Sequence, residues 1–310
     1  METLRRRTRR MFAFGKGILG LDAGPGRFAV LPDPGELAAS ISAVVLAPAM
    51  FDRSAAGRPV LAPALLGEPG DLLAAARAAG VLVGTRADRG SEPLGAGYGR
   101  VTSGLDGLVD RLDEMRERGA RFAVWSTAEA DPAAPHALTA NAQAAARFGY
   151  AAQRAGLVPL IRVGGTSPVR GPGGRGAAER ACAQAAALVS LCVHLEDLDV
   201  DLAATVLVTE PAPGPRAALA VADPLALLPS RLGGVALVTT ARSPRGGADP
   251  ISDSLATGSG GDVTGALRIG GGRPWPVTFY LGWPADAGTP PTRIDQRSAH
   301  VQDRRRRSRG

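Results

Sequence analysis

Eight short apolar runs recur along the chain, and helical stretches lie between most of them. The runs occupy residues 17–23, 42–48, 80–88, 121–127, 157–163, 205–210, 234–240 and 276–282. Each run is apolar almost throughout, which is typical of a parallel strand buried on both faces. A repeated strand-then-helix order with right-handed crossovers predicts an α/β fold, and eight such units predict a single-domain (β/α)8 TIM barrel.

The helical stretches have apolar faces and recognisable ends. They are predicted over residues 70–80, 103–122, 136–156, 177–198 and 223–234. The first ends at Gly80, and the second ends in arginines and Gly119, which suits the carboxyl end of a helix. The segment 241–274 is rich in glycine and lacks a helical pattern, so we expect the last barrel unit to be irregular.

The length and charge of the chain predict one barrel with basic extensions. A TIM barrel takes about 250 residues, so 310 residues leave room for tails, and we place the barrel over 13–285. Arginines crowd both ends of the chain, which carries a formal net charge of +7. We therefore predict disordered basic termini, an arm over 1–12 and a tail over 286–310. Without a nucleic-acid fold motif, they would touch nucleic acid only non-specifically.

The sequence carries no signal for membrane insertion, export or metal binding. No apolar stretch approaches the roughly 18 residues that span a bilayer, so we expect a cytoplasmic protein. Cys182 and Cys192 form no CxxC motif, and we predict that both are small buried residues in a reducing compartment. Because His136, His194 and His300 are scattered, we predict no metal site and no cofactor.

The order of the segments resembles that of class I fructose-bisphosphate aldolases from about Gly15 to Gly282. GKGILGLDAGPGRF is similar to the family's GKGILAADESTG, and VTSGLDGLVDRLDEMRERGARFAVWS is similar to TTQGLDGL…KKDGADFAKWR. AGLVPLIRV resembles NGLVPIVEP, and RPWPVTFYLGW resembles KPWALTFSYGR. The resemblance implies a TIM barrel, a homotetramer and a glycolytic lyase reaction. That reaction cleaves fructose 1,6-bisphosphate to dihydroxyacetone phosphate and glyceraldehyde 3-phosphate.

The family's reaction needs a lysine, because its amine forms a Schiff base with the substrate ketone and arginine cannot replace it. The resemblance places this lysine at Val208 and a second, fourth-strand lysine at Val124. The chain contains a single lysine, Lys16, just before the first predicted strand. It would lie at the face of the barrel opposite the active-site loops. We therefore predict a catalytically inactive member, a pseudoenzyme that has lost the Schiff base.

The other catalytic positions of the family also differ here, with one exception. The first-strand aspartate is retained as Asp22, whereas the glutamate after it is Ala23. The remaining positions fall on Arg89, Ser126, Arg162, Gly164, Thr239, Thr240, Ala241 and Trp283. Asp22 is thus the only catalytic residue that the resemblance carries over.

Polar residues at the predicted strand ends form a candidate ligand site. They are Arg86, Asp88, Arg89, Arg162, Glu210, Thr239 and Thr240. The arginines could clamp a sugar phosphate or another anion. Alternatively, they pair with Asp22, Asp88 and Glu210 in a closed polar ring, which is the arrangement that we favour. The alternative function is a barrel enzyme with a different, lysine-free reaction at the Asp22/Asp88/Glu210 mouth.

Overall fold

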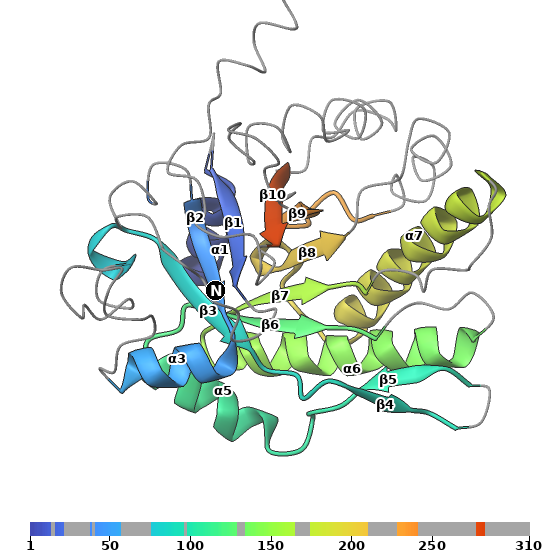
Figure 1. Ribbon diagram of the computed structural model, residues 1–310, viewed down its shortest axis with the longest axis horizontal. Helices are drawn as coiled ribbons and strands as arrows, with labels where there is room; N and C mark the ends of the chain where they lie inside the picture. The colour runs from blue at the N-terminus through green and yellow to red at the C-terminus, as the bar shows by residue number, and fades with distance from the viewer. Residues whose placement is uncertain are drawn as a thin grey trace, which may run out of the picture.

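Eight parallel strands close into one barrel in the computed structural model (Figure 1). The structure describes residues 1–13, 16–21, 38, 41–56, 76–95, 98–128, 134–164, 174–209, 228–240 and 277–282. The barrel order is β1-β10-β9-β8-β7-β6-β3-β2. The strands are β1 (Gly17–Leu21), β2 (Ile41–Leu46), β3 (Leu82–Arg86), β6 (Phe122–Ser126), β7 (Val158–Arg162), β8 (Val206–Thr209), β9 (Gly234–Thr240) and β10 (Val277–Gly282). All eight predicted strands and the predicted α/β barrel are confirmed.

Four of the described α-helices follow strands in the chain. They are α3 (Pro48–Ala55), α5 (Leu108–Glu117), α6 (Pro135–Arg154) and α7 (Gly174–Asp197), with a 3-10 turn η2 (Leu202–Ala204) before β8. The last three of these α-helices confirm the predictions over 103–122, 136–156 and 177–198. The predicted helix over 70–80 is described only from residue 76, where its last turn is helical.

One local prediction needs correction, and one element was not predicted. The helix expected over 223–234 is described only from residue 228, and that part forms turns, because Pro229 cannot donate a helical hydrogen bond. A hairpin of β4 (Ser91–Pro93) and β5 (Arg100–Thr102) separates β3 from α5. The sequence pattern did not reveal it, because strands of three residues are too short to show a period.

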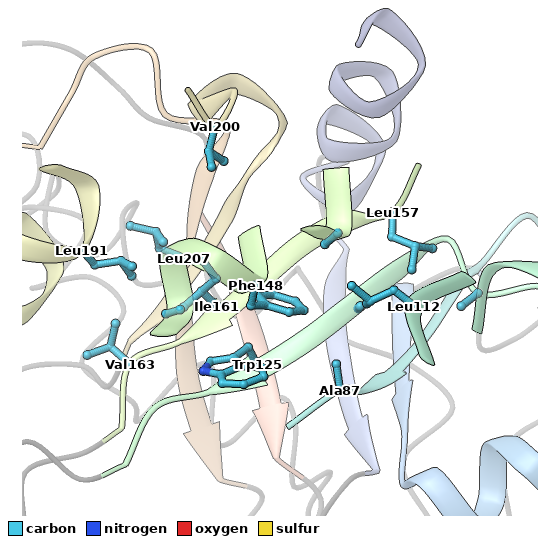
Figure 2. Packing of buried hydrophobic residues seen from close by; sticks show 14 of the residues in the cluster. Ala87, Leu112, Trp125, Phe148, Leu157, Ile161, Val163, Leu191, Val200 and Leu207 are labelled. Atoms are coloured by element: carbon cyan, nitrogen blue, oxygen red, sulfur yellow. The ribbon is translucent and has the colours of Figure 1, made fainter. Parts of the chain in front are cut away.

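Strand side chains alternate between two hydrophobic clusters. The inner cluster fills the barrel and includes Ile18, Val45, Leu82, Phe122, Val124, Leu160, Val206, Val208, Ala236 and Tyr280. The outer cluster packs the strands against the helices, as Figure 2 shows around Trp125 and Phe148. The rings of these two residues stack with centroids 5.3 Å apart. With only 4% aromatic residues in the chain, small aliphatic side chains fill most of both clusters.

The N-terminus is not the disordered arm predicted over residues 1–12. Residues Glu2–Met11 form helix α1, and Leu4, Thr8 and Met11 on one face are buried. Leu4 and Met11 belong to the inner cluster, so α1 packs against the amino end of the barrel. The arm was predicted to be disordered because of its many arginines. Leu4, Thr8 and Met11 recur at the spacing of three to four residues that is typical of a helix, and this signal was not used.

Arginines of α1 bind the turns that lead into the strands. Arg10 Nη2 donates to the carbonyl of Gly80, and Arg7 Nη1 donates to that of Gly156, each at 2.7 Å. Arg5 Nε donates to the carboxylate of Asp201 at 2.7 Å. The basic N-terminus therefore holds the amino end of the barrel together. The predicted tail over 286–310 lies outside the described residues.

Candidate functional site

The carboxyl ends of all eight strands lie at the same end of the barrel, because the strands run parallel. This mouth is where barrel enzymes place their active sites. Arg86 and Arg162 are the last residues of β3 and β7, and Val208 is the residue before the last of β8. Val208 is paired with Arg162 on one side and with Ala236 on the other.

The interior just below the mouth is filled with apolar and aromatic side chains. Val208 and Val124 are both 0% exposed and belong to the inner cluster. Tyr280 of β10 is buried in the same cluster and lies against β1. A Cβ atom at Gly20 would come within 2.6 Å of the Tyr280 hydroxyl, so any larger residue there would require the tyrosine ring to shift. The guanidinium carbon of Arg162 lies 5.8 Å from the centre of the Tyr280 ring, within range of a cation–π interaction.

Asp88 is held by its own turn and by the end of β6. It accepts hydrogen bonds from Arg86 Nε at 3.3 Å and from Arg86 Nη2. The backbone amides of Gly90 and Ser126 donate to the same carboxylate at 3.2 and 3.1 Å. With its side chain fully buried, Asp88 serves to fix the loop after β3. The Arg86–Asp88 pair agrees with the polar-ring interpretation at this one contact.

The other predicted site residues are described only in part. Arg86 and Arg89 line one pocket with Asp88, whereas Arg162 is not among the residues that line it. A clamp formed by all three arginines stays a prediction. Thr239 and Thr240 end β9, but their side chains are not described, and Asp22 and Glu210 lie outside the described residues.

The pocket opens at the carboxyl end of β3, between α3 and α5, which lie side by side in Figure 1. Its volume is about 290 Å³. Its charged lining residues are Asp52, Arg86, Asp88, Arg89, Arg111, Glu114 and Arg118. Arg111 and Arg118 were not predicted as site residues, because only the apolar face and the carboxyl end of this helix were interpreted. Their spacing of seven, which puts both on one helical face, was the available signal.

Cys192 is buried and free, as predicted for a small core residue. Burial raises the pKa of its thiol to about 12, with a smaller contribution from Glu196. The side chain of Cys182 is not described. Among the described residues, no three potential ligands gather into a metal site, and no described helix is long and apolar enough to cross a membrane.

Sequence comparisons connect the chain with one family. The family model for class I fructose-bisphosphate aldolase matches residues 33–168. A probable class 1 fructose-bisphosphate aldolase of Xanthomonas campestris is 41% identical over 86 residues, which cover 26% of each chain. Cytosolic fructose-bisphosphate aldolase 6 of Arabidopsis thaliana is 29% identical over 172 residues, covering 47% of this chain and 45% of the plant protein. These matches thus span less than half of the relatives' length.

A solved structure resembles this chain over most of its length. It is fructose-bisphosphate aldolase from Plasmodium falciparum, in a complex with TRAP and a small-molecule inhibitor. The TM-score is 0.62 with 19% sequence identity, and the similarity covers 91% of this chain and 84% of the other. At that identity, the likeness concerns the fold.

Proposed function

The chain belongs to the class I fructose-bisphosphate aldolase family, and on that premise we propose that it is a catalytically inactive member. The observation that carries this proposal is the environment of Val208. The resemblance places at this position the lysine that forms the Schiff base, and the valine side chain is fully buried in the inner cluster. An alkyl side chain cannot form the iminium that serves as electron sink for carbon–carbon cleavage.

The single lysine of the chain does not compensate for Val208. Lys16 immediately precedes β1, so it lies at the amino end of the barrel, and its Nζ donates to the carbonyl of Ala38 at 2.5 Å. The five residues of β1 separate it from the mouth by about 16 Å, at the usual rise of a strand. A lysine side chain is too short to span that distance.

The filling of the barrel also supports inactivity. In the family motifs given above, serine stands at the position of Tyr280 and alanine at that of Gly20. Here a large ring on β10 is matched by the loss of a methyl group on β1, and the ring occupies the space. The ring and the glycine give this part of the barrel a packed interior, which suits a scaffold better than a substrate pocket.

The lysine-free reaction at the Asp22/Asp88/Glu210 mouth remains the alternative function. Asp88 is a poor general base in this arrangement, since four hydrogen bonds already occupy its carboxylate. Asp22 and Glu210 lie outside the described residues. A homotetramer and a bound sugar phosphate or other anion, which the resemblance implies, stay predictions for this chain.

Borohydride trapping tests the proposed inactivity. The protein is incubated with fructose 1,6-bisphosphate or dihydroxyacetone phosphate and reduced, and a working class I aldolase is treated in parallel. We expect an adduct by intact mass on the working enzyme and none on this protein. Cleavage of fructose 1,6-bisphosphate by this protein in a coupled assay, above the rate measured without protein, would overturn the proposal. An adduct confined to Lys16 or the N-terminal amine would mark surface modification, and the proposal would stand.

A further inference from the structure

We propose that the pocket between α3 and α5 binds a small phosphate-bearing anion through Arg89 and Arg111. The pocket touches Phe51, Ala87 and Met115, which belong to or pack against the outer cluster. It therefore lies on the outer side of the barrel wall, and Val208 and Tyr280 are not among its lining residues. The proposal is independent of whether the barrel interior is catalytic.

The charges that line this pocket do not cancel. Arg86 is paired with Asp88, and Arg118 is paired with both Asp52 and Glu114. All three carboxylates among the described lining residues are thus engaged by two of the four arginines described there. Within the described part of the chain, neither Arg89 nor Arg111 forms an ion pair with a carboxylate. The pocket has positive charge available for an anion.

Arg111 is held in place by neutral groups. Its Nη1 donates to the carbonyl of Asp106, and its Nη2 donates to the carbonyls of Gly104 and Ala87. Its Nε is buried and has no hydrogen-bond partner among the described residues. Burial lowers the pKa of Arg111 from its ordinary value, the positive charge of Arg89 lowers it further, and the negative charge of Asp106 opposes these effects to a smaller extent. An anion beside both groups would relieve that repulsion.

The backbone that carries Arg89 is fixed before any ligand arrives. Its amide donates to the carbonyl of Ser103 at 3.0 Å, and the Ser103 amide donates to that of Gly90 at 2.9 Å. Gly104 approaches so closely that a Cβ there would lie 2.9 Å from the Arg89 nitrogen. The side chain of Arg89 is exposed above this fixed turn. The turn is preorganised, so binding would order little beyond one side chain.

The size and lining of the pocket favour a small phosphomonoester or inorganic phosphate. A volume of about 290 Å³ is at the lower end for ligand pockets. Arginine recognises the oxygen atoms of a phosphate with paired donors, and the exposed guanidinium of Arg89 is available for this contact. Phe51 and Met115 would contact a short carbon chain, which free phosphate lacks.

Calorimetric titration of the full chain tests this site with inorganic phosphate and glycerol 3-phosphate as separate probes. The background is sodium chloride of matched ionic strength. We expect saturable binding of at least one probe, and Arg89→Gln should weaken it about tenfold, as the loss of a charge-assisted contact would. Arg89 is exposed, so this variant should keep the native circular dichroism spectrum. Tighter binding of glycerol 3-phosphate would identify an organic phosphomonoester as the ligand class.

Arg147→Gln is the matched control, because Arg147 is an exposed arginine on α6 and does not line the pocket. It removes the same charge and should leave the affinity unchanged. The proposal is overturned if neither probe binds beyond the chloride background, or if the two variants weaken binding equally. Either outcome leaves the borohydride experiment untouched, since that experiment reports on a covalent bond in the barrel.

Discussion

Tyr280 packs against the backbone of Gly20 so closely that a Cβ at residue 20 would lie 2.6 Å from the phenol oxygen and from ring carbon Cε1. The two residues come from neighbouring strands, β10 and β1, and the tyrosine is buried. A large side chain on one strand thus depends on the absence of a side chain on the next.

This relationship predicts that Gly20→Ala destabilises the protein by about 1–3 kcal/mol, because the added methyl overpacks a closed interior. Urea unfolding followed by circular dichroism would measure the loss. The same substitution in a Tyr280→Ala background should cost much less, because the clash is gone. Equal costs in the two backgrounds would show that the clash with Tyr280 is not the cause.

The contacts of α1 predict that Arg7→Ala lowers the free energy of unfolding by about 1–2 kcal/mol. The guanidinium of Arg7 is partly buried and donates to Gly156, so its loss leaves a carbonyl without its charged donor. Arg6 is exposed on the same helix, and Arg6→Ala should change stability by less than about 0.5 kcal/mol. A disordered basic arm would instead give two variants that unfold alike in urea.

The environment of Val208 predicts that Val208→Lys is strongly destabilising near neutral pH. Burial disfavours the charged ammonium, so the pKa of the new lysine should be lower in the folded than in the unfolded chain. Between those two pKa values the unfolded state binds more protons, and stability therefore rises with pH. Relative to wild type, the deficit should shrink as the pH approaches 10, whereas the apolar Val208→Met control should show a deficit that does not depend on pH. A constant deficit for the lysine variant would mean that its amine reaches water.

Burial of Cys192 predicts a thiol that does not react in the native state. Its pKa is raised to about 12 from an ordinary value of 9.0, so the contribution to stability is complete below about pH 9 and is lost as the pH rises towards 12. In a Cys182→Ser background, a thiol reagent at pH 8 should label Cys192 only after unfolding in urea. Rapid labelling of the folded protein would contradict the burial of this side chain.

Much of the fold follows from the sequence because its signals are local. A strand buried on both faces must be apolar at nearly every position, so each of the eight strands is visible as a run in the printed sequence. Gly80 and Gly119 were predicted to end helices, and both have the positive φ of a left-handed turn, 73° and 108°. Helix α1 was missed because three buried side chains among many arginines are a weak signal.

The sequence by itself determined that the chain has one lysine and a valine where the resemblance puts the covalent lysine. Only the tertiary structure decided how charges pair, because ion pairs depend on distances between residues far apart in the chain. It joined Arg86 to Asp88, set Arg162 beside Tyr280, and placed Arg89 with Arg111 of α5. The basic N-terminus, expected to be a disordered arm, is a helix that packs against the amino end of the barrel. Its arginines bind the carbonyls of Gly156 and Gly80, which come near the helix only after the chain has folded.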